Sequence, residues 1–114
     1  MGLFDFLKPQ SSQQKRQAEL LRDMQAKMQI IFPRGKPEIE EWSRRVFDAV
    51  GGRLTMQECY FIFSAITFLY LTADDKSESR MVESILNRAN GKISREDALR
   101  IFMVICAHER ARHE

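Results

Sequence analysis

Apolar residues recur every three or four positions along most of the chain, the spacing that places them on one face of an α-helix. In the N-terminal third, Ser11 and Gln14 form a capping-box pair that predicts a helix start. Pro33 predicts its end near residue 31, because proline disfavours helical backbone in the residue before it. The apolar stripe of this helix consists of Leu21, Met24, Met28 and Ile31, and its other faces are rich in Gln, Lys and Arg.

The first eight residues form a separate short segment, in which Phe4 and Phe6 flank Asp5 and which Pro9 is expected to end. An aromatic, amphipathic segment of this kind is able to lie in a membrane interface, or to pack on its own domain or on a second subunit. We favour packing over the membrane, because eight residues alone give a weak anchor.

Four more helices are predicted after residue 36. The first begins at Pro37, a residue that suits a first helical turn, and ends at the glycine pair of residues 51 and 52. The others begin at the hydroxyl residues Thr55, Ser77 and Ser94, each in a position to cap a helix. The helix of residues 55–71 is apolar almost all round and is expected to be the most buried. The charged end, from His108 to Glu114, is expected to fray.

The fold class expected from this pattern is all-α, with about five helices. We expect an N-terminal amphipathic segment and helix in residues 1–36, and a domain of two helix-turn-helix units in residues 37–114.

The two helix-turn-helix units repeat each other at an offset of 39 residues. Each turn has a glycine that allows a left-handed backbone, an apolar residue that fills the corner between helices, a hydroxyl cap and an acid three positions later. These turn residues are Gly52, Leu54, Thr55 and Glu58 in the first unit and Gly91, Ile93, Ser94 and Asp97 in the second.

This repeated turn resembles a pair of EF-hands over roughly residues 38–109. The resemblance implies that Gly52 and Gly91 are the sixth loop positions, and that Leu54 and Ile93 form a short β-bridge between the loops. The first, third and fifth positions are then Phe47, Ala49 and Gly51 in one loop, and Leu86, Arg88 and Asn90 in the other. Calcium needs six to eight oxygen ligands, so no calcium binding is expected.

The segment Ala89-Asn90-Gly91-Lys92-Ile93-Ser94-Arg95-Glu96 is also similar to the turns of the tellurite-resistance (TerB-like) helical domains. Asn90 stands where those turns have Asp, so a metal role does not transfer. A well-capped helix-turn-helix pair of any origin has the same appearance, and the sequence leaves these alternatives open.

Composition removes several chemistries from consideration. The net charge is only +2, which gives no strong field toward nucleic acid or membranes. Cys59 and Cys106 lie in apolar stretches and are expected to be buried, reduced thiols. His108 and His113 are five residues apart, which is not the spacing of a zinc-binding helix. No catalytic constellation, metal site or cofactor site is expected.

The start of the chain has no secretory pattern, and the longest apolar run, residues 60–71, is too short to span a bilayer. A cytoplasmic protein is therefore expected.

The function predicted from these observations is that of a small helical protein-interaction or adaptor module without catalysis, binding another protein or itself as a homodimer. The alternative is an accessory protein at a membrane or on nucleic acid that acts through residues 1–36, whose net charge is +4; nucleic acid is the less favoured target because acids are interleaved with the cations. The expected contact residues are Phe4, Phe6, Leu21, Met24, Met28, Ile31, Trp42, Phe63 and Tyr70.

Overall fold

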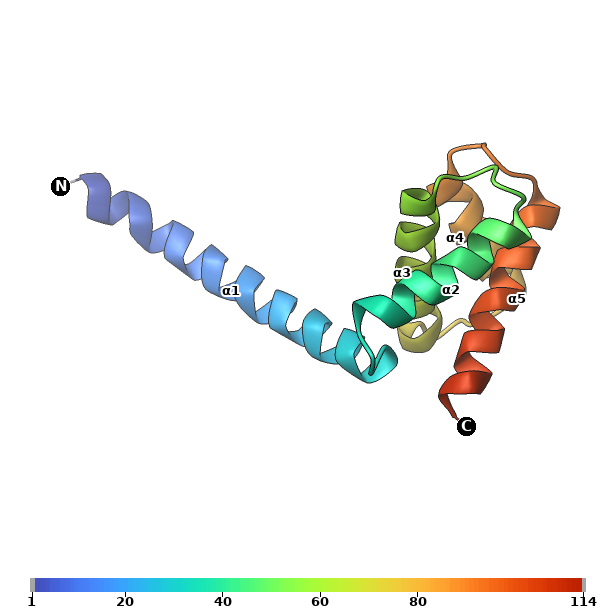
Figure 1. Cartoon of the computed structure of the whole chain (residues 1–114). Helices are drawn as coiled ribbons and strands as arrows, with labels where there is room; N and C mark the ends of the chain where they lie inside the picture. Colours follow the sequence, from blue (N-terminus) through green and yellow to red (C-terminus); the bar gives the residue numbers. More distant parts are fainter. Residues whose placement is uncertain (1, 114) are drawn as a thin grey trace. The chain divides into compact units, whose positions relative to one another are not determined.

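The computed structural model describes residues 2–113, with side chains described from residue 15 onward (Figure 1). All of the regular secondary structure in this part of the chain is helical, which confirms the expected all-α fold of five helices. The chain divides into two units, Met1–Pro33 and Arg34–Glu114. The helices are α1 (Gly2–Ile31), α2 (Lys36–Ala49), α3 (Met56–Thr72), α4 (Glu78–Ala89) and α5 (Arg95–Arg112).

The first unit consists of α1. The prediction that a helix starts at Ser11, after a break at Pro9, is wrong, because α1 runs without interruption from Gly2. A proline inside a helix removes one backbone hydrogen bond and crowds the preceding turn. A 30-residue helix retains enough of its other backbone bonds to continue through that position.

The second unit packs α2 to α5 around one core. Helix α5 contacts α2 and α4, and α3 contacts the same two helices (Figure 1). The core is made mostly of aliphatic side chains that recur at helical spacing and are almost fully buried, together with a few aromatic ones such as Trp42 and Phe63. Its centre includes Val46, Ile62, Ile66, Ile85, Ile101 and Ile105.

Local capping explains where three of these helices begin. The hydroxyl oxygens of Thr55, Ser77 and Ser94 each accept a hydrogen bond from a backbone N–H of the following turn. Helix α2 begins differently, after Gly35 at a φ of 72° and with Pro37 in its first turn. The helix starts predicted at Thr55, Ser77 and Ser94 are therefore confirmed.

The C-terminal end differs from its prediction. Helix α5 continues to Arg112, and His108 is only 2% exposed, so the frayed tail expected from residue 108 onward is wrong as far as residue 112. A buried acid on α2, Glu38, lies 70 residues away in the sequence, and its Oε2 forms a hydrogen bond with Nε2 of the His108 ring.

Candidate functional site

The apolar stripe of α1 is largely open to solvent. Leu21 and Met24 are 57% and 50% exposed, and Leu20, beside them on the helix surface, is 63% exposed. Further along the stripe Met28 is half-buried and Ile31 is buried. The side chains of Phe4 and Phe6, also expected to make contacts, lie outside the described residues.

Trp42 and Phe63 belong to the core of the second unit. Their rings are stacked, with centroids 6.4 Å apart and planes at 6°, and they are 6% and 0% exposed. This corrects the expectation that both are contact residues for a partner. Tyr70 is half-buried, with its ring edge-on to Phe102 at 5.8 Å.

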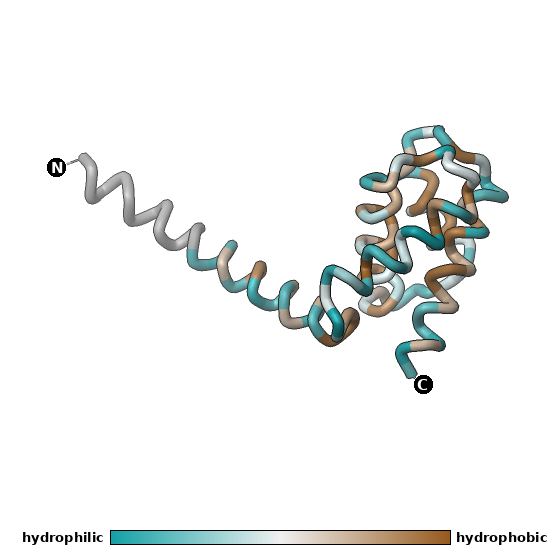
Figure 2. The backbone as a smooth tube through the Cα atoms, in the orientation of Figure 1, coloured by the Kyte–Doolittle hydropathy of each residue, from teal (hydrophilic) through white to brown (hydrophobic). Residues whose placement is uncertain are grey.

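Helix α3 has an exposed apolar side, although its sequence predicts the most buried helix. Phe61 is 57% exposed, and Phe68, two turns later, is half-buried on the same side. Ser64 and Ala65 lie between the two aromatic side chains, and the hydroxyl of Ser64 donates to the carbonyl of Tyr60 in its own helix. Hydropathy colouring shows few hydrophilic positions along α3 after its first turn (Figure 2).

The two turns of the repeat have the same backbone. Gly52 and Gly91 both have a φ of 76°, and the residues before them, Gly51 and Asn90, have φ values of 60° and 52°. The apolar residues at the corner, Leu54 and Ile93, are 1% and 7% exposed. The left-handed glycines and buried corners predicted from the 39-residue repeat are thus present in both units.

The loop positions and the β-bridge that the EF-hand resemblance implies differ from the observed backbone of these turns. Helix α2 continues to Ala49, so that Phe47 and Ala49 are helical residues and not loop residues. The described backbone of Leu54 and Ile93 forms no β-bridge. The turns between helices are therefore short, at residues 50–55 and 90–94.

Each turn supplies a cation to the acid of the other turn. Lys92 Nζ lies 2.7 Å from Glu58 Oε2, and Arg53 Nε lies 3.1 Å from Asp97 Oδ2. Arg53 and Lys92 occupy equivalent positions of the repeat, as do Glu58 and Asp97. The two units are therefore joined by a reciprocal pair of ion contacts.

The acids of these two contacts differ in burial and in further partners. Glu58 is part of a complete capping box, in which its carboxylate accepts from the backbone N–H of Thr55. The hydrogen bond from Lys92, helped by that backbone bond, holds the pKa of Glu58 below its usual value. The side chain of Asp97 is only 2% exposed and, besides its ion pair with Arg53, accepts a hydrogen bond from Arg100 Nη1 at 2.8 Å.

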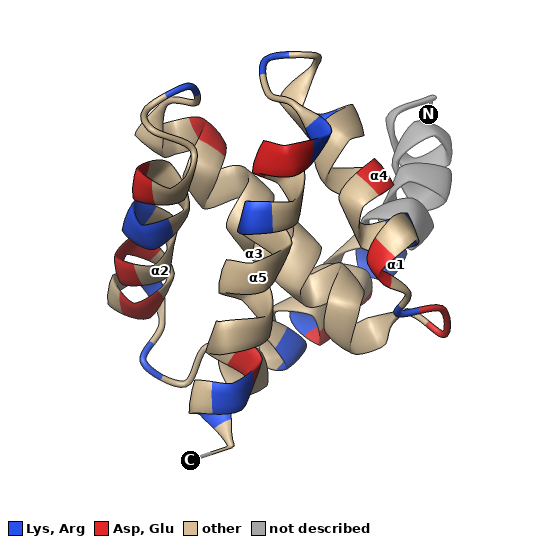
Figure 3. Cartoon of the chain, turned by 90° about the vertical axis from the view of Figure 1, so that its right-hand side faces the viewer, with Lys and Arg blue, Asp and Glu red and all other residues tan. Residues whose placement is uncertain are grey.

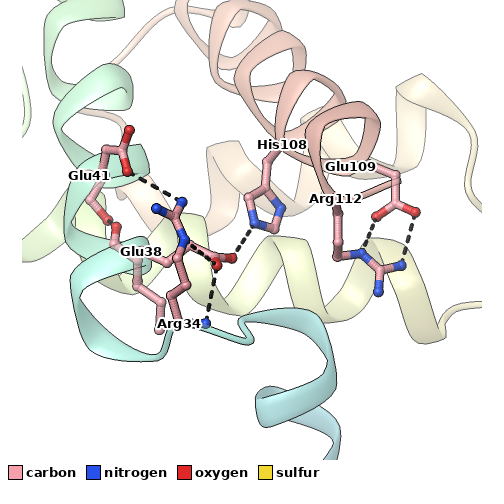
Figure 4. A network of polar contacts seen from close by, with 8 residues as sticks. Arg34, Glu38, Glu41, His108, Glu109 and Arg112 are labelled. Carbon is pink, nitrogen blue, oxygen red and sulfur yellow. Dashed lines mark hydrogen bonds and ion pairs between the residues drawn. The ribbon is translucent and has the colours of Figure 1, made fainter. Parts of the chain in front are cut away.

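A second polar network joins α2 to α5 inside the domain (Figure 4). Glu38 Oε2 lies 2.9 Å from His108 Nε2, and its other oxygen accepts from the backbone N–H and the Nε of Arg34. The rings of Trp42 and Phe63 meet the His108 ring edge-on, at 5.1 and 5.3 Å. One carboxylate thus connects the segment before α2 to the last turns of α5.

The chemistry available to this network is limited by its burial. A carboxylate beside an imidazole is an arrangement typical of general base catalysis. A substrate must reach the imidazole for that role, but both side chains are less than a tenth exposed and aromatic rings cover the histidine. The geometry suits a buried connection between two helices.

The thiols are both free. Burial raises the pKa of Cys59 to about 11, and burial also raises the pKa of the half-buried Cys106. A thiol with a raised pKa holds little thiolate and is a poor nucleophile near neutral pH.

The described residues contain neither a metal-binding cluster nor a helix able to span a membrane. No three acidic, histidine or cysteine side chains among residues 15–113 gather in the way that a metal ion requires. Within the described part of the chain, every helix is too short or too polar to cross a lipid bilayer.

The polar and apolar surfaces of the second unit are unevenly distributed. Charged positions follow the outer side of α2, whereas most of α3 and the middle of α5 are uncharged (Figure 3). Among the residues whose side chains are described, the stripe on α1 and the open side of α3 each present large apolar side chains to solvent. Comparison with protein-family models, with curated proteins and with solved structures finds no match to this chain, so these surfaces are the guide to its function.

Proposed function

We propose that this protein is a non-catalytic helical interaction module that associates with a second copy of itself through the apolar stripe of α1. The observation that carries the proposal is the exposure of Leu20, Leu21 and Met24, each at least half open to solvent. Three large apolar side chains on adjacent positions of one helix favour a contact that removes them from water.

The spacing and type of the apolar residues in α1 favour association with another helix. Leu21, Met24 and Met28 follow a three-four spacing, which is the pattern of a helix that packs along another helix. A helix gains most of its stability from packing its apolar side, not from intrinsic propensity. Methionine also adapts to varied surfaces, because its side chain is unbranched and flexible.

The charges of α1 leave this stripe accessible. Lys15, Glu19 and Arg22 lie on the opposite side of the helix, as the 3.6-residue period requires, and all three are exposed. Both signs are present there, so two copies need not bring a row of like charges together.

The proposal is tested by sedimentation velocity of the full-length chain over a range of micromolar concentrations. We expect a dimer that the double variant Leu21→Glu, Met24→Glu converts to a monomer. The matched control is Ala26→Glu, Gln29→Glu, which adds the same charge to exposed positions away from the stripe and should leave the dimer intact. A full-length monomer at every concentration would contradict self-association.

The exposed cations of α1 favour one alternative, an accessory role at an anionic membrane or on nucleic acid. Lys15, Arg16, Arg22 and Lys27 are all exposed. Binding to anionic vesicles or to duplex DNA should then fall steeply with salt concentration. Replacing these four residues by Gln should abolish such binding, whereas the same change should leave a dimer formed through the stripe in place.

A further inference from the structure

The apolar stripe of α1 contains one polar position. Gln17 is exposed and continues the three-four spacing of the stripe, four residues before Leu21 and seven before Met24. At the other end of the stripe, Met28 is half-buried and Ile31 is buried. The stretch from Gln17 to Met24 is thus the accessible part of the stripe among the residues whose side chains are described. A second copy that covers Leu21 and Met24 also covers the amide of Gln17.

We propose that two copies pair their α1 helices in parallel and in register, so that Gln17 of one copy faces Gln17 of the other. The inference rests on the proposed self-association through the stripe and names the orientation of the two helices. Each position of the stripe then meets its own equivalent, Leu21 against Leu21 and Met24 against Met24. The partner of the stripe is the same stripe on a second copy.

The amide of Gln17 favours the parallel orientation. An amide is both donor and acceptor, so two facing Gln17 side chains are able to hydrogen-bond to each other where the contact excludes water. In an antiparallel pair that sets Leu21 against Met24, Gln17 instead meets Met28. A thioether is a weak acceptor and donates nothing, so a covered amide lacks adequate partners there. One polar residue in a contact between helices specifies the register in this way.

The charges beside the stripe agree with the parallel orientation. Arg16, Asp23 and Lys27 lie along one flank of α1, about 70 to 110° around the helix from the centre of the stripe, at about 100° per residue. The other flank has the neutral side chains of Ala18 and Gln25 at similar angles. All five are exposed. Parallel helices bring opposite flanks together, so the charged flank of each copy meets the neutral flank of the other.

An antiparallel pair brings the charged flank of each copy against the same flank of the other. In the register that sets Leu21 against Met24, Arg16 is offset along the axis by only about 3 Å from Lys27 of the second copy, at about 1.5 Å per residue. Asp23 is offset by only about 2 Å from its own equivalent in the same register. Like charges placed opposite each other disfavour a contact. This register is therefore opposed by its charges.

Shifting the antiparallel pair by seven residues removes these like-charge contacts but costs apolar ones. Shifted in one direction, Leu21 meets Gln17 in place of Met24. Shifted in the other direction, Leu21 meets Ile31, which is only 5% exposed and so is not open to a second chain. The parallel pair is the arrangement that matches the stripe positions and also keeps the charged flanks apart.

Cysteine crosslinking of the full-length chain distinguishes the two orientations. Parallel helices bring the thiols of Gln17→Cys within reach of a disulfide, which needs Cα atoms about 4.4 to 6.8 Å apart. In the antiparallel register described first, the two positions are about 16 Å apart along the axis. We expect Gln17→Cys to form a covalent dimer under mild oxidation. The matched control is Glu19→Cys, at an exposed position on the opposite side of α1, which should form none. The oxidised parent, which keeps Cys59 and Cys106, gives the baseline.

Opposite charges at position 17 give a second test. Gln17→Glu and Gln17→Lys should each weaken self-association by a factor of roughly ten or more, because each places like charges face to face. An equimolar mixture should recover the dimer, as a heterodimer in which a carboxylate faces an ammonium group. An antiparallel pair sets each new charge against Met28, so mixing then recovers nothing. Sedimentation velocity measures the recovery, with Glu19→Lys as a control that should associate like the parent.

The outcomes separate the orientation from the proposed self-association. If Gln17→Cys alone forms no crosslink while its mixture with Met28→Cys does, the parallel orientation is overturned and an antiparallel stripe contact takes its place. A dimer in which neither crosslink forms also overturns the inference, because the stripe then contacts some other surface. A full-length monomer at every concentration contradicts the self-association itself, and the inference with it.

Discussion

The two turns of the second unit have nearly the same backbone but use their acids differently. Both have a glycine at a φ of 76° and a hydroxyl N-cap. In the first turn, Glu58 reaches back to the N–H of its own cap residue, Thr55. In the second turn, Asp97 is one methylene shorter, and its carboxylate instead binds Arg53 and Arg100 in the domain interior. Both acids bridge the two units, and the longer side chain of Glu58 also lets it cap its own helix.

The largest expected difference between the turns is the effect of removing each acid. Asp97→Ala should lower the free energy of unfolding by about 2 kcal/mol, because it removes one charge-assisted hydrogen bond and one ion pair made by a buried carboxylate. The remaining guanidiniums are about half exposed and can regain water, which limits the loss. Glu58→Ala should cost less, and urea unfolding of the two variants measures the difference.

Glu96→Ala is the control for this pair. Glu96 also pairs with Arg100, but its side chain is 76% exposed. Surface ion pairs contribute little to stability, so the change should have a minor effect. If Asp97→Ala unfolds at the same urea concentration as Glu96→Ala, the buried bridge makes no special contribution.

The N-caps should differ less than the acids do. Thr55→Ala and Ser94→Ala should each cost about 1 kcal/mol, because each leaves one backbone N–H of the next helix without its hydroxyl acceptor. Thermal unfolding of the two variants, with the corresponding Gly variants as controls, measures this. Equal costs at the two caps would show that the complete capping box at Thr55 adds little beyond the hydroxyl.

The features that could be predicted from the sequence, the helix starts and the left-handed turns, are set by residues that lie close together in the chain. Thr55 and Ser94 identify helix starts because a cap and its acceptor bond lie within one turn. The 39-residue repeat likewise predicted that Gly52 and Gly91 share a left-handed backbone, since a turn of this kind needs a residue without a Cβ atom. The repeat also places Arg53 and Lys92 at equivalent positions. It does not predict that each of these cations pairs with the acid of the other turn.

Contacts between distant residues could not be predicted in this way. Nothing near His108 in the sequence identifies Glu38 as its partner, so the sequence alone predicts a charged tail where the structure has a buried histidine. The apolar composition of α3 likewise does not show how many sides other helices cover. Within the second unit, α2, α4 and α5 pack against α3 but leave Phe61 57% exposed, which is how an apparent core helix also presents a surface.

The smallest expected effect concerns the titration of Glu58. Its pKa is lowered chiefly by the hydrogen bond from Lys92, so ionised Glu58 stabilises the fold above the ordinary carboxyl pKa of 4.5. That contribution is lost as the pH falls below 4.5 and through the lower pKa of the folded state. Lys92→Met should raise the pKa of Glu58 toward its usual value, while the bond from Thr55 keeps part of the shift. Carboxyl carbon NMR between pH 2 and 7 measures this, with Lys76→Met as a control; an unchanged Glu58 titration in Lys92→Met would show that this contact between the turns is absent in solution.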